Sequence, residues 1–171
     1  MTGSIQDAAA SAAVLLAFAA FVVAGGALAV IDARTHRLPN AIVLPAYPVA
    51  AILLTAAALL SGDPPRLVVA ATGMVALFAF YLLLRLVRPA AMGGGDVKLA
   101  GLIGLHLGWL GWSELLVGSV AAFLLAGVFG VVLLATGRAG RSTAIAFGPW
   151  MILGAWAAIL LALLGRAGGQ T

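Results

Sequence analysis

The sequence of 171 residues contains no cysteine, only two histidines and only five acidic residues. The absence of cysteine excludes disulfide bonds, zinc sites built on thiolates and a cysteine nucleophile. Charged residues make up 8% of the chain, whereas soluble domains carry about 25%. So little charge cannot cover a water-exposed surface, and the sequence therefore predicts a protein embedded in a lipid bilayer.

Long stretches without charge indicate how the chain crosses the bilayer. A helix needs about 20 apolar residues to span a membrane, so most of these stretches are long enough and one, 99–113, is marginal. We predict an all-α polytopic membrane protein with about six transmembrane helices, in which residues 1–171 form a single membrane-embedded domain. The stretches cover residues 8–31, 38–62, 67–84, 99–113, 115–137 and 142–165.

Basic residues decide the predicted orientation. If the helices alternate, the loops after odd-numbered helices share one side, and the positive-inside rule places the more basic side in the cytoplasm and both termini outside. This balance requires 99–113 to cross as a short span. Topology then explains the net charge of +4, and we predict no nucleic-acid partner. The cytoplasmic group is Arg34, Arg37, Arg85, Arg88, Lys98, Arg138 and Arg141, and the outer group is Arg66 and Arg166.

Asp32 and Asp96 stand out among the acidic residues. Asp32 ends the first apolar stretch, Asp96 follows three glycines, and both fall on the predicted cytoplasmic side. An ionisable group at a membrane edge is costly, which makes each aspartate a functional candidate. Each also has a structural alternative: Asp96 as a helix N-cap, and Asp32 as an interfacial partner of Arg34 or Arg37.

Together the two aspartates predict the acid pair of an aspartic protease. Two close carboxylates do not both ionise easily, so one keeps its proton while the other acts as a base. The base activates a water that attacks a peptide carbonyl, and the acid donates a proton to the tetrahedral species. Because Asp96 lies at a helix start near Lys98, we expect it to be the more acidic partner and the base, with Asp32 as the acid.

Three motifs in this order resemble the type IV prepilin peptidases, a family of membrane aspartic proteases of the G-x-G-D kind. The motifs lie within residues 32–40, 93–99 and 146–150. The resemblance implies that Asp32 and Asp96 are the catalytic pair. It assigns positioning roles to Gly93, Gly95, Lys98, Pro39, Gly148 and Pro149.

The same resemblance implies a substrate and a location. The substrates are prepilins or pseudopilins, whose short basic leader is cut at the cytoplasmic face of the bacterial inner membrane. Longer family members carry an N-terminal segment with paired cysteines that is associated with methylation. This sequence has no cysteine and no such segment before the first stretch. It resembles the short, peptidase-only members, and we expect neither a methyl-donor cofactor nor a metal.

Two other functions remain open at this stage. One is another G-x-G-D protease, similar to preflagellin peptidases or to signal-peptide peptidases, although the latter have a Tyr-Asp pair where Ile31 precedes Asp32 here. The other is a small proton-coupled transporter that uses Asp32 and Asp96 as relay carboxylates. A transporter is expected to place them near the midplane and to show inverted repeats.

Histidine chemistry is disfavoured by position. His36 belongs to the predicted cytoplasmic loop and His106 to the fourth span, so the two do not meet, and no paired-histidine helix motif is present. We expect His106 to be a hydrogen-bonded packing residue. The oligomeric state is left open.

Overall fold

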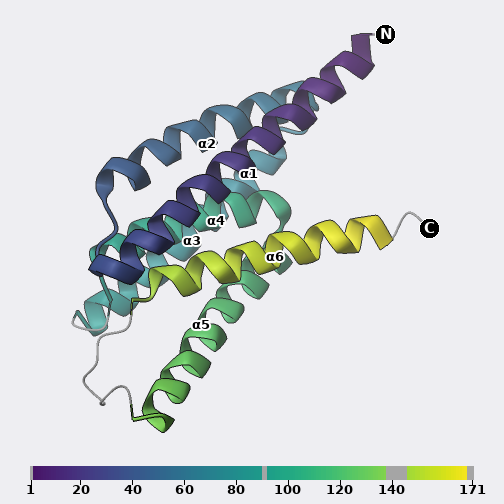
Figure 1. Ribbon diagram of the computed structural model, residues 1–171. Helices are drawn as coiled ribbons and strands as arrows, with labels where there is room; N and C mark the ends of the chain where they lie inside the picture. The colour runs from purple at the N-terminus through teal and green to yellow at the C-terminus, as the bar shows by residue number, and fades with distance from the viewer. Residues whose placement is uncertain (1, 90–91, 138–145, 169–171) are drawn as a thin grey trace.

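A computed structural model describes residues 2–89, 92–137 and 146–168, which contain six helices and no β-strand. Every helix except α4 is long and apolar enough to cross a membrane. The prediction of an all-α polytopic membrane protein is therefore confirmed, with six helices in the described residues, and the predicted short span 99–113 falls in α4, which is not one of the five candidate spans (Figure 1). The helices are α1 (Thr2–Thr35), α2 (Asn40–Leu60), α3 (Pro65–Val87), α4 (Gly94–Leu110), α5 (Trp112–Ala135) and α6 (Gly148–Gly168).

The turn between α1 and α2 has clear local causes. His36 takes a left-handed conformation with φ 51°, and its N–H donates to the Asp32 carbonyl, which ends α1. Pro39 then lies in extended backbone and precedes the first residue of α2. As a result, Asp32 stands in the last turn of α1, close to the start of α2.

The short helix α4 forms the centre of the bundle. It has 17 residues, most of them buried, and packs most extensively against α3. Glycines allow the two backbones to touch: a Cβ on Gly104 would lie 2.9 Å from the Gly73 carbonyl carbon, and one on Gly108 would lie 2.8 Å from the Val69 oxygen. Contacts from Arg85 against Gly94 to Arg66 against Trp109 show that α4 runs antiparallel along α3.

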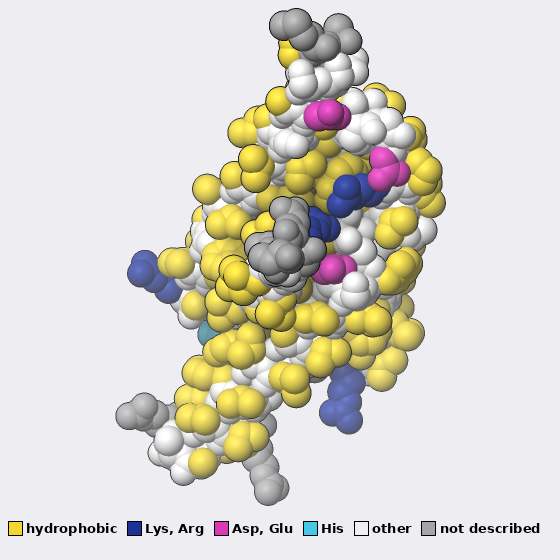
Figure 2. Space-filling model, turned by 90° about the vertical axis from the view of Figure 1, so that its right-hand side faces the viewer, with side chains coloured by type: hydrophobic (Ala, Val, Ile, Leu, Met, Phe, Trp, Pro, Cys, Tyr) yellow, Lys and Arg dark blue, Asp and Glu magenta, His cyan; other side chains and the backbone are white. Residues whose placement is uncertain are grey.

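The helix ends that carry the three motifs meet at one end of the bundle. Gly148 at the start of α6 contacts Asp32, and Lys98 near the start of α4 contacts Asn40 at the start of α2. Figure 1 shows the other ends of α1 and α6 on the opposite side of the bundle, where the two helices diverge. Figure 2, viewed from that opposite side, shows a surface dominated by hydrophobic side chains, with charged ones near its middle.

The glycine contact between α3 and α4 gives a test of the fold. Replacing Gly104 by Ala forces a methyl group into the backbone of α3, and we expect a loss of about 1–3 kcal/mol in stability. Gly127→Ala is the matched control, because no atom lies within 4 Å of its Cβ position in α5. Alanine at position 127 should stabilise the helix relative to glycine by up to about 1 kcal/mol. Thermal unfolding in detergent checks both variants, and equal melting temperatures would contradict the packing.

Candidate active site

Asp32 is held by the start of another helix. Its side chain is 5% exposed, and its Oδ2 accepts a hydrogen bond of 3.0 Å from the Gly148 N–H. The first N–H groups of a helix lack partners within the helix and favour a negative charge. A Cβ on Gly148 would lie 2.6 Å from this oxygen, so only glycine leaves room for the contact. The structure thus has Asp32 buried against α6 rather than paired with the exposed Arg34 or Arg37.

Asp96 is held by the backbone just before its own helix. It is 8% exposed, and its Oδ2 accepts a hydrogen bond of 2.9 Å from the Gly93 N–H. Gly93 is the N-cap of α4, so Asp96 is the third residue of the helix and not the cap itself. Its carboxylate reaches back to the cap, as the acidic residue of a capping box does.

The two carboxylates share one cavity of about 420 Å³ at this end of the bundle. The lining residues come from the end of α1, from the turn after it, and from Gly93 and the first turn of α4. Sequence-predicted residues Pro39, Gly93 and Gly95 line it as well. Gly95 is needed for packing, since a Cβ there would lie 2.6 Å from the Leu38 Cβ. The complete lining is Asp32, His36, Arg37, Leu38, Pro39, Gly93, Gly94, Gly95 and Asp96.

Burial dominates the electrostatics of Asp96, which lies outside the five apolar spanning segments. Burial and, less strongly, the charge of Asp32 raise its pKa to about 6, against the lowering effects of the Gly93 N–H and of Arg85. Lys98 does not neutralise it, because its Nζ donates to Asn40 Oδ1 at 2.9 Å. Neither influence expected from the sequence sets the pKa of Asp96: Lys98 is directed toward Asn40, and burial outweighs the Gly93 N–H.

Lys98 and Pro149 lie beside the cavity and do not line it. Lys98 ties α4 to α2 twice, through Asn40 and through its own carbonyl, which accepts a hydrogen bond of 2.5 Å from the Tyr47 hydroxyl. Pro149 is the second residue of α6, where its missing N–H leaves no helical hydrogen bond unmade. Both residues fix the helix starts that hold the aspartates.

Sequence reasoning assigned no role at the site to Arg85, and it placed Phe147 within the third motif without a contact. Arg85, in the last turn of α3, lies against Gly94 and acts electrostatically on Asp96. Phe147 precedes Gly148 and contacts the rings of Phe123 and Tyr81, with centroids 5.2 and 6.1 Å away. From the sequence, Arg85 contributed only to the predicted orientation in the membrane. The one signal of its contact was Gly94, the middle glycine of the triplet, where the lack of a side chain leaves room for a bulky group.

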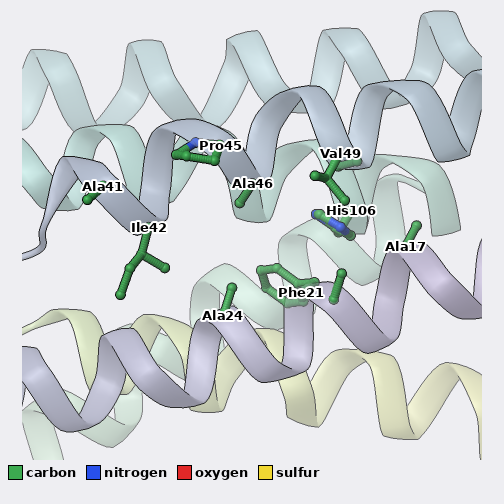
Figure 3. A pocket seen from close by; sticks show the side chains of 11 residues that line it. Ala17, Phe21, Ala24, Ala41, Ile42, Pro45, Ala46, Val49 and His106 are labelled. Carbon is green, nitrogen blue, oxygen red and sulfur yellow. The ribbon is translucent and has the colours of Figure 1, made fainter.

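His106 belongs to a second cavity, of about 300 Å³, between α1 and α2 (Figure 3). Its Nδ1 lies 2.9 Å from the Leu102 carbonyl, which can only accept, so Nδ1 carries the proton. The ring stacks on Phe21 with centroids 4.3 Å apart. The expectation of a hydrogen-bonded packing residue is confirmed. Within the described part of the chain, no cluster of three metal-ligating side chains occurs.

The fold and the site define a polytopic helical membrane protein with two buried carboxylates in one cavity. Residues 15–135 match the type IV leader peptidase family, and the chain belongs to this family. The match contains Asp32 and Asp96, whereas Gly148 and Pro149 lie beyond it.

Curated relatives bear the name prepilin leader peptidase/N-methyltransferase. The protein of Stutzerimonas stutzeri is 31% identical over 135 residues, which are 78% of this chain and 45% of the relative. That of Dickeya chrysanthemi is 33% identical over 157 residues, covering 88% of this chain and 51% of the relative. The chain thus spans about half the length of the relatives it matches. No solved structure matches it.

The raised pKa of Asp96 predicts that its charge destabilises the fold. A carboxyl with a pKa of about 6 when folded and 3.8 when unfolded binds its proton more tightly in the folded state. Stability therefore falls as the pH rises through this interval, and the loss is complete above it. Asp96→Asn removes the charge and keeps an oxygen for Gly93, so we expect a gain of up to about 3 kcal/mol at pH 8 that shrinks toward pH 4.

Thermal unfolding in detergent at pH 8 and pH 5 measures this gain. Asp63→Asn, at an exposed position in the turn between α2 and α3, is the control and should change little at either pH. A variant at Asp96 that is equally or less stable than the wild type at pH 8 contradicts the proposed cost of the buried charge.

Proposed function

We propose that the protein is a membrane aspartic endopeptidase that cleaves the leader peptides of type IV prepilins or pseudopilins. The observation that carries the proposal is the single cavity lined by Asp32 and Asp96. Membership of the type IV leader peptidase family supports it, as do the names of the relatives. The proposal covers residues 1–171 as one peptidase unit.

The carboxylates are oriented for hydrolysis by an activated water. Each carboxylate accepts a hydrogen bond at its Oδ2 from a backbone N–H: Asp32 from Gly148, and Asp96 from Gly93. Among the described residues, no group hydrogen-bonds to either Oδ1, and we assign these two oxygens to water and substrate. The ionised carboxylate takes a proton from water, whose oxygen attacks the carbonyl carbon while the protonated carboxyl gives its proton to the carbonyl oxygen. Collapse breaks the C–N bond: the proton held by the base passes to the amine, and one hydroxyl of the tetrahedral species returns its proton to the other carboxylate, so the pair regains its single proton.

The structure supports an order of protonation opposite to that expected from the sequence. Burial raises the pKa of Asp96 to about 6, which favours Asp96 as the holder of the shared proton. Asp32 is also buried, but its Oδ2 lies on the first N–H of α6, where the helix dipole offsets part of the cost of an ionised carboxylate. We therefore assign the initial acid to Asp96 and the initial base to Asp32, within a pair that titrates as one unit.

We further propose that the cavity faces the cytoplasm of a bacterial inner membrane, with both termini outside. In support, Arg34, Arg37 and Arg85 belong to helix ends and turns on the cavity side, as do Arg88 and Lys98. Two basic residues, Arg66 and Arg166, belong to the opposite end. This distribution follows the positive-inside rule. Arg138 and Arg141, which were predicted on the same side as the cavity, lie outside the described residues.

The position of the pair favours a peptidase over a transporter. Asp32 is in the last turn of α1 and Asp96 in the first turn of α4, so both stand at one end of the bundle. Relay carboxylates of a transporter are expected near the midplane. A site at the helix ends receives water and an extended peptide directly from the aqueous side.

Loss of either carboxylate is expected to stop cleavage. Asp32→Asn and Asp96→Asn each remove one half of the acid–base pair and should lower the rate by about 100- to 10,000-fold. Co-expression with the prepilins of the same organism, scored as leader loss on a gel at equal membrane levels, measures the effect. Asp63→Asn is the control and should cleave normally. Cleavage by both site variants contradicts the pair, and a wild type that cuts no prepilin contradicts the proposed substrate class.

The contact between Gly148 and Asp32 gives a second, graded test. Gly148→Ala places a methyl group against Asp32 Oδ2 and breaks its hydrogen bond. A hydrogen bond to a charged group contributes about 1.5–3 kcal/mol, equivalent to about a 10- to 100-fold loss in cleavage rate. Gly165→Ala is the control in the same helix, because no atom lies within 4 Å of its Cβ position. Equal rates for the two variants would show that Asp32 needs no support from α6.

A further inference from the structure

Arg85 approaches the site from α3 and belongs to none of the three motifs. It lies in the last turn of that helix and is partly buried. Its guanidinium occupies the space that a side chain on Gly94 would need: Nη1 would clash with a Cβ there, and Cζ would lie 3.1 Å from it. The guanidinium thus rests directly on Gly94 in the first turn of α4, the turn that carries Asp96.

The contact with Arg85 uses the space that the lack of a side chain at Gly94 leaves open. Gly94 does not have the left-handed φ that only glycine adopts easily, because the glycines with positive φ are Gly62, Gly111 and Gly137. It is also the first residue of α4, a position at which alanine supports a helix better. The group that occupies the place of a side chain at Gly94 is therefore the flexible end of Arg85.

Arg85 is the group that brings positive charge to Asp96 from α3. Its charge acts on Asp96 and favours the ionised carboxylate. Tyr81, one turn earlier on the same face of α3, is buried and also interacts with Asp96. The other charged or titratable groups around the aspartate are Asp32 at the end of α1, His36 and Arg37 in the turn after it, and Lys98 on α4, which is engaged by Asn40.

We propose that Arg85 is a positioning residue of this peptidase, which braces the first turn of α4 through Gly94 and supplies positive charge to Asp96. The inference rests on the proposed function and adds a residue to its machinery. The alternative role, a basic residue that only orients the helix in the membrane, makes Arg85 equivalent to Arg88. Arg88 is one turn further along and exposed, so it provides a matched control.

The pH profile of cleavage separates these roles. Arg85→Gln removes a charge that favours ionised Asp96, so both limbs of the profile should move to higher pH, by about 0.5–1 unit. Arg88→Gln should keep the wild-type limbs. Arg85→Lys retains the charge and should restore most of the shift. A rate that falls equally at every pH, or limbs that move equally for Arg85→Gln and Arg88→Gln, overturns the proposal.

Gly94→Ala tests the contact while leaving Arg85 in place. The new methyl group displaces the flexible end of the guanidinium, and alanine suits the helix start, so the variant should fold. Its limbs should shift in the same direction as those of Arg85→Gln. In the double variant Gly94→Ala with Arg85→Gln, the limbs of the pH profile should move little further than in either single variant, because both changes remove the same interaction. If the shifts of the two single variants simply add in the double variant, the proposed brace is contradicted.

A stability cycle keeps the test separate from the peptidase assignment. Asp96→Asn is made in the wild type and in Arg85→Gln, and melting temperatures are measured in detergent at pH 8 without substrate. Coupling predicts that removal of the Asp96 charge raises the melting temperature more in Arg85→Gln, by about 2–4 °C. Equal gains in the two backgrounds overturn the role of Arg85 even if the wild type cleaves prepilins. A positive cycle with no cleavage of any prepilin contradicts the proposed function and leaves the Arg85 contact standing.

Discussion

Two carboxylates that are removed from solvent need donors, and this requirement fixes the end of the bundle that carries the site. Asp32 Oδ2 accepts a hydrogen bond of 3.0 Å from the Gly148 N–H, and Asp96 Oδ2 accepts one of 2.9 Å from the Gly93 N–H. Both donors are backbone groups at helix starts, which are otherwise unpaired. The first bond joins residues 116 positions apart, so the last turn of α1 cannot move without the first turn of α6. Glycine at position 148 follows from this geometry.

The packing of α4 against α3 extends the same constraint through the bundle. Gly104 and Gly108 allow the two backbones to approach closely, which fixes how far α4 slides along α3. That register also decides which part of α3 lies beside the glycine loop, and it places Arg85 on Gly94. A shift of one turn would move the guanidinium by about 5 Å and separate it from the loop. A contact in the centre of the bundle therefore controls the electrostatics at its end.

The sequence was sufficient for the helices and for the aspartates, but not for their surroundings. Charge-free stretches predicted the helices because an apolar run in so uncharged a chain has few other structures available. The fourth stretch was placed at 99–113, whereas α4 covers Gly94–Leu110, because a helix can begin with glycines, Asp96 and Lys98 that a count of charge excludes. The direction of Lys98 toward Asn40 and the approach of Arg85 depend on side-chain packing between helices. In sequences that are apolar on every side, periodicity does not show which face meets which helix.

The protonation order illustrates this limit of local reasoning and its chemical consequence. From the sequence, the helix start and Lys98 were the only visible influences on Asp96, and both favour an ionised carboxylate. In the fold, α1, α3 and the glycine loop cover Asp96, and burial becomes the largest influence on its pKa. A buried carboxylate with a raised pKa destabilises the folded state when it is ionised. The same property keeps a proton on one member of the pair closer to neutral pH, which hydrolysis by a water between two carboxylates requires. The burial that reduces the stability of the helical bundle is thus the burial that supports the chemistry proposed for it.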